Sequence, residues 1–179
     1  MDIEKEQQLI EASKKDPNNF EPLYVKYYEP ILKFVYKRVE SLDDCRDITS
    51  IVFTNALANI SKYKDMGFPF SSWLYRISIN EINMFYRRSK KVRIISLNDN
   101  GIKSMASESE GVDEELITAL KKSLLYLSED ELLLIELRFF EERPFAEIGA
   151  ILEITEGNAK VRTYRVLDKL KEIYHKVNV

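Results

Sequence analysis

Apolar residues recur at helical spacing along most of the chain. The first long stripe consists of Phe20, Leu23, Tyr24, Tyr27, Ile31, Phe34 and Val35, and it predicts one amphipathic helix after a shorter helix that Pro17 interrupts. A second stripe runs from Ile48 to Ile60 with Asp43 as its expected N-cap, and a third starts at Ser71 or Ser72. Because each helix has one apolar face, these helices can bury a shared core. We therefore predict a helical domain over residues 1–93.

The apolar pattern stops in the segment SLNDNGIKSMASESEGVD, residues 96–113, where Ser, Asn, Asp and Gly dominate. Such a composition is typical of a linker, which we place at residues 94–112. Helical spacing resumes at Glu114, and Ser128 with Glu131 matches a capping box before a run of apolar residues. These features predict a second helical domain over residues 113–179.

The segment FAEIGAILEITEGNAKVRTYRVLDKL, residues 145–170, has the plan of a helix-turn-helix. A short helix from Phe145 to Leu152 is followed by a turn and by a longer helix that Thr155 can cap. The residues expected to pack the two helices together are Ile148, Leu152, Ile154, Ala159 and Val166, with Gly149 as the small residue where the helices cross. The expected fold class is all-α: two small helical domains joined by a flexible linker, the C-terminal one containing a helix-turn-helix. A plain helical hairpin with a solvated basic face is the alternative.

Charge is distributed unevenly along the chain. The net charge of −3 over 179 residues alone argues against a nucleic-acid binder. Residues 62–93, however, hold eight basic and two acidic residues, and residues 156–176 hold six basic and three acidic residues. Between them, residues 94–117 hold six acidic residues and one basic residue. Two basic islands flanking an acidic bridge favour contact with nucleic acid, although solvated charged faces remain the alternative.

Several classes of protein are disfavoured by what the sequence lacks. The single Cys45 and the lone His175 offer neither a disulfide nor a metal site, and both fit a reducing cytoplasm. Asp43, Asp44 and Asp47 could serve a metal-dependent nuclease, but their place at the start of a helix explains them better. We therefore expect no enzyme, no catalytic residue, no metal and no cofactor. The charged N-terminus and the absence of a run of ~20 apolar residues predict no membrane insertion.

Five segments resemble the sigma-70 family of transcription-initiation factors. Residues 147–149 and 157–166 resemble the EIA and GTVKSRxxRA-like elements of its region 4, with departures that include Glu153 where the turn usually carries Gly. The stretch FEPLYVKYYEPILKFVYKRV resembles the opening of region 2, and residues 47–53 resemble its DLxQEVF helix. Residues 70–88 resemble the FxxWLYRIAxNxxxDYxRR signature. The linker is too short for a further helical domain, so the resemblance is to the small extracytoplasmic-function (ECF) subfamily.

The resemblance implies a cytoplasmic sigma factor that binds core RNA polymerase and directs promoter recognition and DNA opening. Core RNA polymerase and promoter DNA are the implied partners, with an anti-sigma factor as a further candidate. The implied polymerase-binding residues are Asp47, Ile48, Ile51, Val52 and Phe53. The implied minus-ten and melting residues are Lys62, Lys64, Phe68, Phe70, Trp73, Arg76, Asn80, Arg87 and Arg88. The implied minus-thirty-five residues are Lys160, Val161, Arg162, Tyr164 and Arg165.

The chemistry of promoter opening explains why aromatic and basic residues are expected in region 2. A base that leaves the stack costs a few kcal/mol, which an aromatic stack or a pocket can offset. The loop from Tyr63 to Ser72 is the expected place, although Phe68, Phe70 and Trp73 can equally be core residues. Arg87, Arg88, Lys90 and Lys91 are suited to phosphate contacts.

Two hypotheses compete with a sigma factor as the function of the chain. One is a helix-turn-helix repressor that acts alone, and the other is an adaptor that binds only proteins.

Overall fold

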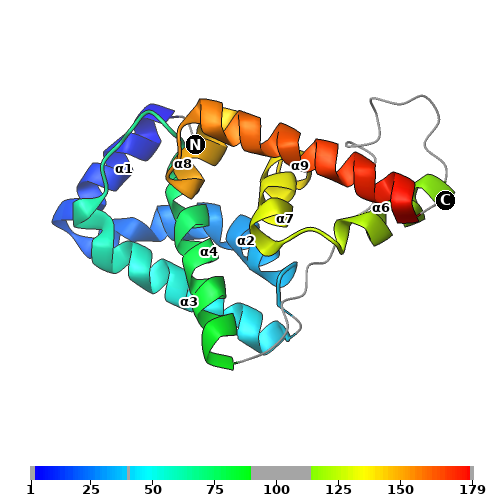
Figure 1. Ribbon diagram of the computed structural model, residues 1–179. Helices are drawn as coiled ribbons and strands as arrows, with labels where there is room; N and C mark the ends of the chain where they lie inside the picture. The colour runs from blue at the N-terminus through cyan, green and yellow to red at the C-terminus, as the bar shows by residue number, and fades with distance from the viewer. Residues whose placement is uncertain (1–2, 40, 90–113, 178–179) are drawn as a thin grey trace. The chain divides into compact units, whose positions relative to one another are not determined.

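The computed structural model describes residues 3–39, 41–89 and 114–177. Every element within these ranges is helical, which confirms the predicted all-α class. The chain divides into two compact units, Met1–Ser96 and Leu97–Val179 (Figure 1). The predicted linker over residues 94–112 lies outside the described ranges. None of the helices in these ranges is long and apolar enough to cross a membrane.

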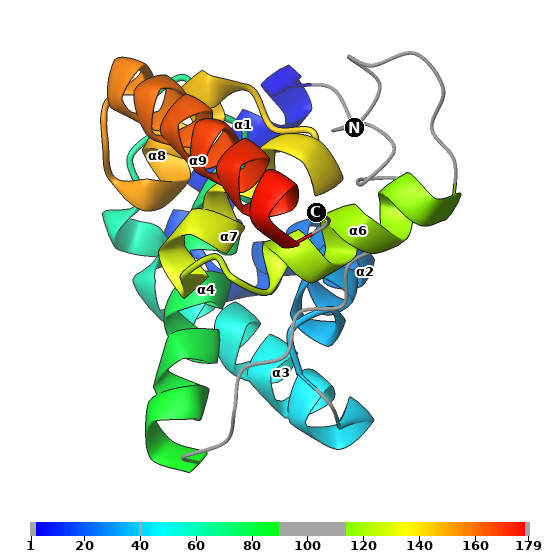
Figure 2. The ribbon, with the colours of Figure 1, turned by 45° about the vertical axis from the view of Figure 1, so that its right-hand side comes forward.

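Within residues 3–39 and 41–89, the first unit contains four helices and two 3-10 turns. They are α1 (Ile3–Lys15), η1 (Pro17–Phe20), α2 (Glu21–Tyr36), α3 (Leu42–Asn59), η2 (Ile60–Lys62) and α4 (Phe70–Ser89). Helix α3 packs against both α2 and α4 (Figures 1 and 2). Their shared core includes the fully buried Leu23, Ile31, Phe34, Val52 and Leu74. Burying one such side chain contributes about 1.5–3 kcal/mol, so this core fixes the pairing of the helices.

The boundaries of α3 and α4 differ from those expected from the sequence. Ser41, not Asp43, caps α3, because its backbone is extended and its hydroxyl accepts hydrogen bonds from the backbone N–H groups of Asp43 and Asp44. Asp43 and Asp44 instead lie in the first turn, where a carboxylate is favoured by the helix dipole. Helix α4 begins at Phe70, one residue before the earlier of the two expected starts.

The second unit contains the remaining helices of the described chain. They are α6 (Glu114–Leu124), α7 (Glu129–Ile135), the π-helical turn η3 (Glu136–Phe140), α8 (Phe145–Leu152) and α9 (Glu156–Val177). The predicted capping box is present: the Ser128 hydroxyl accepts from the Glu131 backbone N–H, and the Glu131 carboxylate accepts from the Ser128 backbone N–H. Glu131 also bonds Lys169 of α9 at 2.7 Å, and this hydrogen bond lowers the pKa of the Glu131 carboxyl. The start of α7 is thereby tied to α9.

Candidate functional site

The outer surface of α3 carries only part of the predicted polymerase-binding set. Asp47 and Ile51 are exposed, Ile51 to 45%. Ile48, Val52 and Phe53 are at most 4% exposed and belong to the core. Because a helix turns by 100° per residue, positions 48 and 52 face inward while 47 and 51 reach the surface. Asp47 and Ile51 are therefore the residues of this set that can contact a partner directly.

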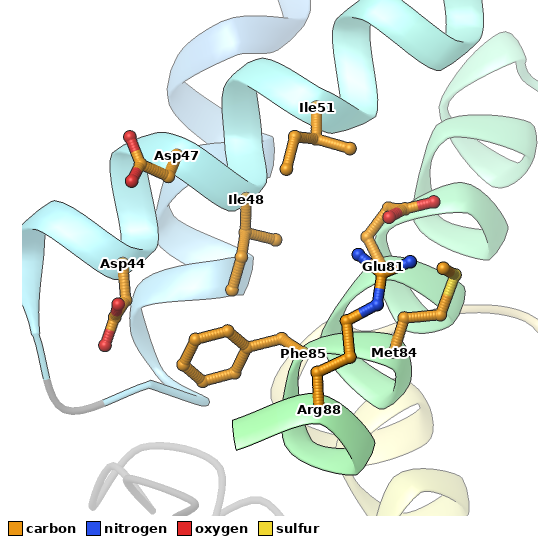
Figure 3. Close-up of a pocket in the computed structure, with 8 residues that line it drawn as sticks. All are labelled: Asp44, Asp47, Ile48, Ile51, Glu81, Met84, Phe85 and Arg88. Carbon is orange, nitrogen blue, oxygen red and sulfur yellow. The ribbon is translucent and has the colours of Figure 1, made fainter.

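A hollow of about 380 Å³ adjoins these two residues, between α3 and α4 (Figure 3). Its lining residues are Asp44, Asp47, Ile48, Ile51, Glu81, Met84, Phe85 and Arg88. Ile48 and Phe85 face one another from the two helices, so the floor is apolar. Asp44 and Asp47 give its α3 edge a negative charge. The contribution of α4 was missed from the sequence, although 81, 84/85 and 88 follow one face of a helix. Arg88, predicted to hold DNA phosphate, lies at this hollow.

The segment between η2 and α4, residues 63–69, is named here the opening loop. It is shorter than the loop expected from the sequence, because Phe70, Ser71 and Ser72 belong to α4. Gly67 has a φ of 78°, a left-handed conformation that glycine adopts without steric cost. The Gly67 backbone N–H donates to Asp65 Oδ1 at 2.8 Å, which closes the turn. Lys64 is exposed and Phe68 is half-buried, so both can meet DNA.

Phe70 is a core residue and not part of the exposed loop. It is 1% exposed, and its ring lies against those of Tyr63 at 5.2 Å and Trp73 at 5.4 Å between centroids. This position is incompatible with direct capture of a base, so the core alternative holds for Phe70. Burial, together with the carboxylates of Asp65 and Glu6, raises the pKa of Tyr63 to about 12. The Tyr63 phenol therefore stays protonated at neutral pH.

A second hollow, of about 370 Å³, gathers four of the predicted DNA-contacting residues, and we name it the amide hollow. Its lining residues are Asn55, Asn59, Lys62, Trp73, Arg76, Ile77, Asn80 and Glu81. Lys62, Trp73, Arg76 and Asn80 come from the predicted set, whereas the two α3 amides were missed. Their spacing was a usable signal, because 55, 59 and 62 share one helix face, as do 73, 76/77 and 80.

Polar contacts order the α3 side of the amide hollow. Lys62 Nζ donates to Asn59 Oδ1 at 3.2 Å, and the Asn59 amide donates to the Asn55 carbonyl at 2.9 Å. Asn55 Nδ2 donates to Glu81 Oε1 at 2.9 Å and so joins α3 to α4. Trp73 is half-buried and Asn80 is exposed. The hollow therefore combines an aromatic ring, amides and cations in one place.

Arg87 is also among the predicted minus-ten and melting residues. It does not line the amide hollow, and it is exposed on α4.

The second unit contains the predicted helix-turn-helix, formed by α8 and α9. Ile148, Ala159 and Val166 are buried at the helix contact, whereas Leu152 and Ile154 are only half-buried. Ile151, 2% exposed, was missed as a packing residue.

The turn between α8 and α9 depends on a close approach of two backbones. A Cβ atom added to Gly149 would lie 2.8 Å from the Ile154 carbonyl oxygen, so glycine is required there. Glu153 adopts the left-handed conformation with a φ of 57°. Thr155 caps α9 as predicted, because its Oγ1 accepts from the Asn158 backbone N–H at 3.2 Å.

Four of the five predicted α9 residues share an exposed face. They are Lys160, Val161, Tyr164 and Arg165, with Val161 49% and Tyr164 51% exposed. Arg162 is exposed too, but its Nε donates to Asn158 Oδ1 at 2.9 Å along the helix. The Phe145 ring of α8 lies 6.1 Å from that of Tyr164 and supports the face from beside it. Phe145 was missed, since its role depends on the packing of α8.

The second unit contains a helix-turn-helix, which is a DNA-binding motif, and the first unit is helical with a hollow of amides, cations and an aromatic ring. The Sigma-70 region 2 model matches residues 23–92, and the Sigma-70, region 4 model matches residues 124–172. The chain belongs to the sigma-70 family. It contains regions 2 and 4 and is an ECF sigma factor that directs RNA polymerase to promoters, without catalytic activity of its own.

Known proteins extend the similarity over nearly the whole chain. The ECF RNA polymerase sigma factor SigW of Bacillus subtilis (strain 168) is 25% identical over 96% of this chain and 97% of its own length. CnrH, in complex with the cytosolic domain of CnrY, has a similar structure with a TM-score of 0.61, 17% identity and coverage of 94% and 96%. The sigma factor RpoE in complex with the anti-sigma factor NepR from Bartonella quintana has a TM-score of 0.59, 19% identity and coverage of 87% and 96%. At these identities the two structures show the fold alone.

Proposed function

We propose that the amide hollow and the opening loop together hold the unpaired minus-ten strand of the promoter. The observation that supports this proposal is the convergence of Lys62, Trp73, Arg76 and Asn80 on one hollow. An aromatic face can stack on an unpaired base at about 1–3 kcal/mol per base. Amide groups such as that of Asn80 can bond base edges, and Lys62 and Arg76 can neutralise phosphates.

Core polymerase, on this proposal, contacts α3 through Asp47 and Ile51. Both are exposed on the helix that resembles the family's polymerase-binding segment, and the apolar hollow beside them can receive a partner's side chain. Asp47→Arg is expected to weaken binding to core polymerase, whereas Asp43→Arg is the matched control. Asp43 is an exposed aspartate one turn earlier on α3, and it does not line the hollow. Equal affinities of the two variants would remove Asp47 from the interface.

The exposed α9 face is proposed to read the minus-thirty-five element. The N-terminal part of the second helix of this motif enters the major groove, and Lys160, Val161, Tyr164 and Arg165 lie there. Loss of a base contact costs about 1–3 kcal/mol at one position, whereas loss of a phosphate contact weakens all sequences alike. Transcription from a library randomised across this element separates these outcomes for Lys160→Ala and Arg165→Ala.

Two further proposals concern the setting in which the chain acts. Because core polymerase and promoters are its partners, we place it in the cytoplasm. We also propose regulation by an anti-sigma factor, supported by the complex of RpoE with NepR as a protein of the same fold. Co-purification tests this proposal: the tagged chain is isolated from its host, and the proteins bound to it are compared with and without added core polymerase. An inhibitor that competes with core polymerase for the chain should be lost when core polymerase is added.

Run-off transcription from genomic fragments tests the proposed function as a whole. Purified core polymerase with the chain should start at discrete sites, and core polymerase alone should not. Tight, sequence-selective binding of a palindrome by the chain alone would favour a repressor. Failure to direct transcription from any fragment would favour an adaptor.

A further inference from the structure

Helix α1 lies before the part of the chain that the region 2 model matches, yet it is firmly attached to the first unit. Ile10 is 5% exposed and Ser13 is 1% exposed. The Glu6 carboxylate, 8% exposed, accepts hydrogen bonds from Lys26 Nζ at 2.5 Å and from the Tyr27 hydroxyl, both on α2. These buried contacts fix the inner face of α1 against α2, so α1 is a rigid support for whatever lies beside it.

The opening loop runs alongside α1 (Figure 1), and two side-chain contacts join them. Gln7 Nε2 donates to Asp65 Oδ2 at 2.8 Å. The Lys14 ammonium lies 5.8 Å from the centre of the Tyr63 ring, where the loop starts. Because Asp65 Oδ1 accepts from the Gly67 backbone N–H at the same time, one carboxylate holds the turn of the loop and joins it to α1.

The middle of the loop, from Lys64 to Gly67, has little else to hold its shape. Met66, at its tip, is 77% exposed, and the residues from Lys64 to Gly67 are all exposed. A segment that buries so little surface is ordered mainly by its polar contacts, since burial does not offset the entropy of ordering it. A loop that is already in place loses less entropy when it engages a DNA strand.

We propose that Gln7 is a positioning residue for promoter opening, which acts through Asp65 to hold the opening loop beside the amide hollow. This inference rests on the proposed function of that loop and extends it to α1. Gln7 itself touches no DNA on this account. Its effect is on the rate of duplex opening by the holoenzyme and not on the binding of core polymerase or on the closed complex.

Exchange of the hydrogen-bonding groups provides the test. Gln7→Glu places a second carboxylate against Asp65 and should slow opening of a duplex promoter by about fivefold to tenfold, the scale of one lost hydrogen bond plus like-charge repulsion. In Gln7→Glu/Asp65→Asn, the Asn amide can donate to the carboxylate introduced on α1 while its oxygen still accepts from Gly67, so the rate should return to within about twofold of wild type. Gln8→Glu is the matched control, because Gln8 is the exposed neighbour on the same helix.

The opening rate is measured with reconstituted holoenzyme by permanganate reactivity on a duplex promoter, and run-off transcription is measured on the same promoter with a premelted bubble. Slowing by Gln7→Glu alone, reversal in the double variant and rescue on the bubble support the proposal. A Gln7→Glu variant that opens the duplex like Gln8→Glu overturns it, as does a double variant as slow as the single one. If the wild-type holoenzyme opens no promoter at all, the proposed function of the chain has failed, and not the role of Gln7 alone.

Discussion

Gly149→Ala tests the geometry of the helix-turn-helix most sharply. The added methyl group would meet three backbone atoms of the turn: the Ile154 carbonyl oxygen at 2.8 Å, the Glu156 nitrogen at 3.2 Å and the Thr155 carbonyl carbon at 3.3 Å. None of these is the end of a flexible side chain. The turn must therefore move, although the Ile154 backbone N–H is bonded to the Gly149 carbonyl at 2.9 Å.

The free energy of unfolding of the second unit should fall as a result. Forcing a methyl group into a filled site costs typically about 1–3 kcal/mol. Alanine is the better helix former by about 1 kcal/mol, which offsets part of that cost. We expect a net loss of about 0–2 kcal/mol, centred near 1 kcal/mol. In Gly157→Ala, where no atom beyond the adjoining helix backbone lies within 4 Å of the added methyl group, the same propensity should leave stability unchanged or raised by up to about 1 kcal/mol.

Urea denaturation of the full chain separates the two units. The only tryptophan, Trp73, lies in the first unit, so its fluorescence reports that unit alone, while circular dichroism reports both. Gly149→Ala should lower the midpoint of the helical signal of the second unit by about 1 M at an m-value near 1 kcal/mol/M, with the Trp73 transition unchanged. If Gly149→Ala and Gly157→Ala are equally stable, the close approach of α8 to the turn is wrong.

Three further outcomes follow from the structure. Glu153→Gly should stabilise the second unit by about 0.5–1 kcal/mol relative to Glu153→Ala, because a side chain in the left-handed conformation is strained; equal urea midpoints would contradict this. Phe70→Ala should cost about 3–5 kcal/mol in the Trp73 transition of the first unit, and the half-buried Phe68→Ala much less; a stable Phe70→Ala variant would reopen a DNA role for Phe70. The lowered pKa of Glu131 means that its pairing with Lys169 contributes stability above the unfolded carboxyl pKa and loses it as pH falls through the folded value. Lys169→Met should therefore be less stable than wild type at pH 7 by about 0.2–1 kcal/mol, with the gap closing in acid; a gap independent of pH would exclude the pair as its cause.

Much of the fold could be predicted because local signals agreed with the packing. The capping box at Ser128, the Thr155 cap and the spacing of Lys160, Val161, Tyr164 and Arg165 all depend on short stretches of sequence. The cap of α3 was misplaced because Ser41 and Asp43 are both good capping residues, and only backbone conformation separates them.

The site could be predicted less well, because it depends on which helix faces meet. From the sequence, Phe70 looks like an aromatic residue of an exposed loop. Only the packing of the helices shows that it is buried in the core. Asn55 and Asn59 join the amide hollow only because α3 packs on α4, and Arg88 lies at the other hollow for the same reason. The contact of Gln7 with Asp65 spans 58 residues, and no local pattern indicates it.

Duplex opening by Asn80→Ala holoenzyme tests the central claim that the amide hollow holds the unpaired minus-ten strand. The control is Asn83→Ala on the same helix, since Asn83 is not among the lining residues. Asn80→Ala should form the closed complex with wild-type affinity, open a duplex promoter several-fold more slowly by permanganate reactivity, and recover run-off transcription on a premelted bubble, while Asn83→Ala opens normally. Normal opening by Asn80→Ala, or a defect that the premelted bubble fails to rescue, would contradict the claim.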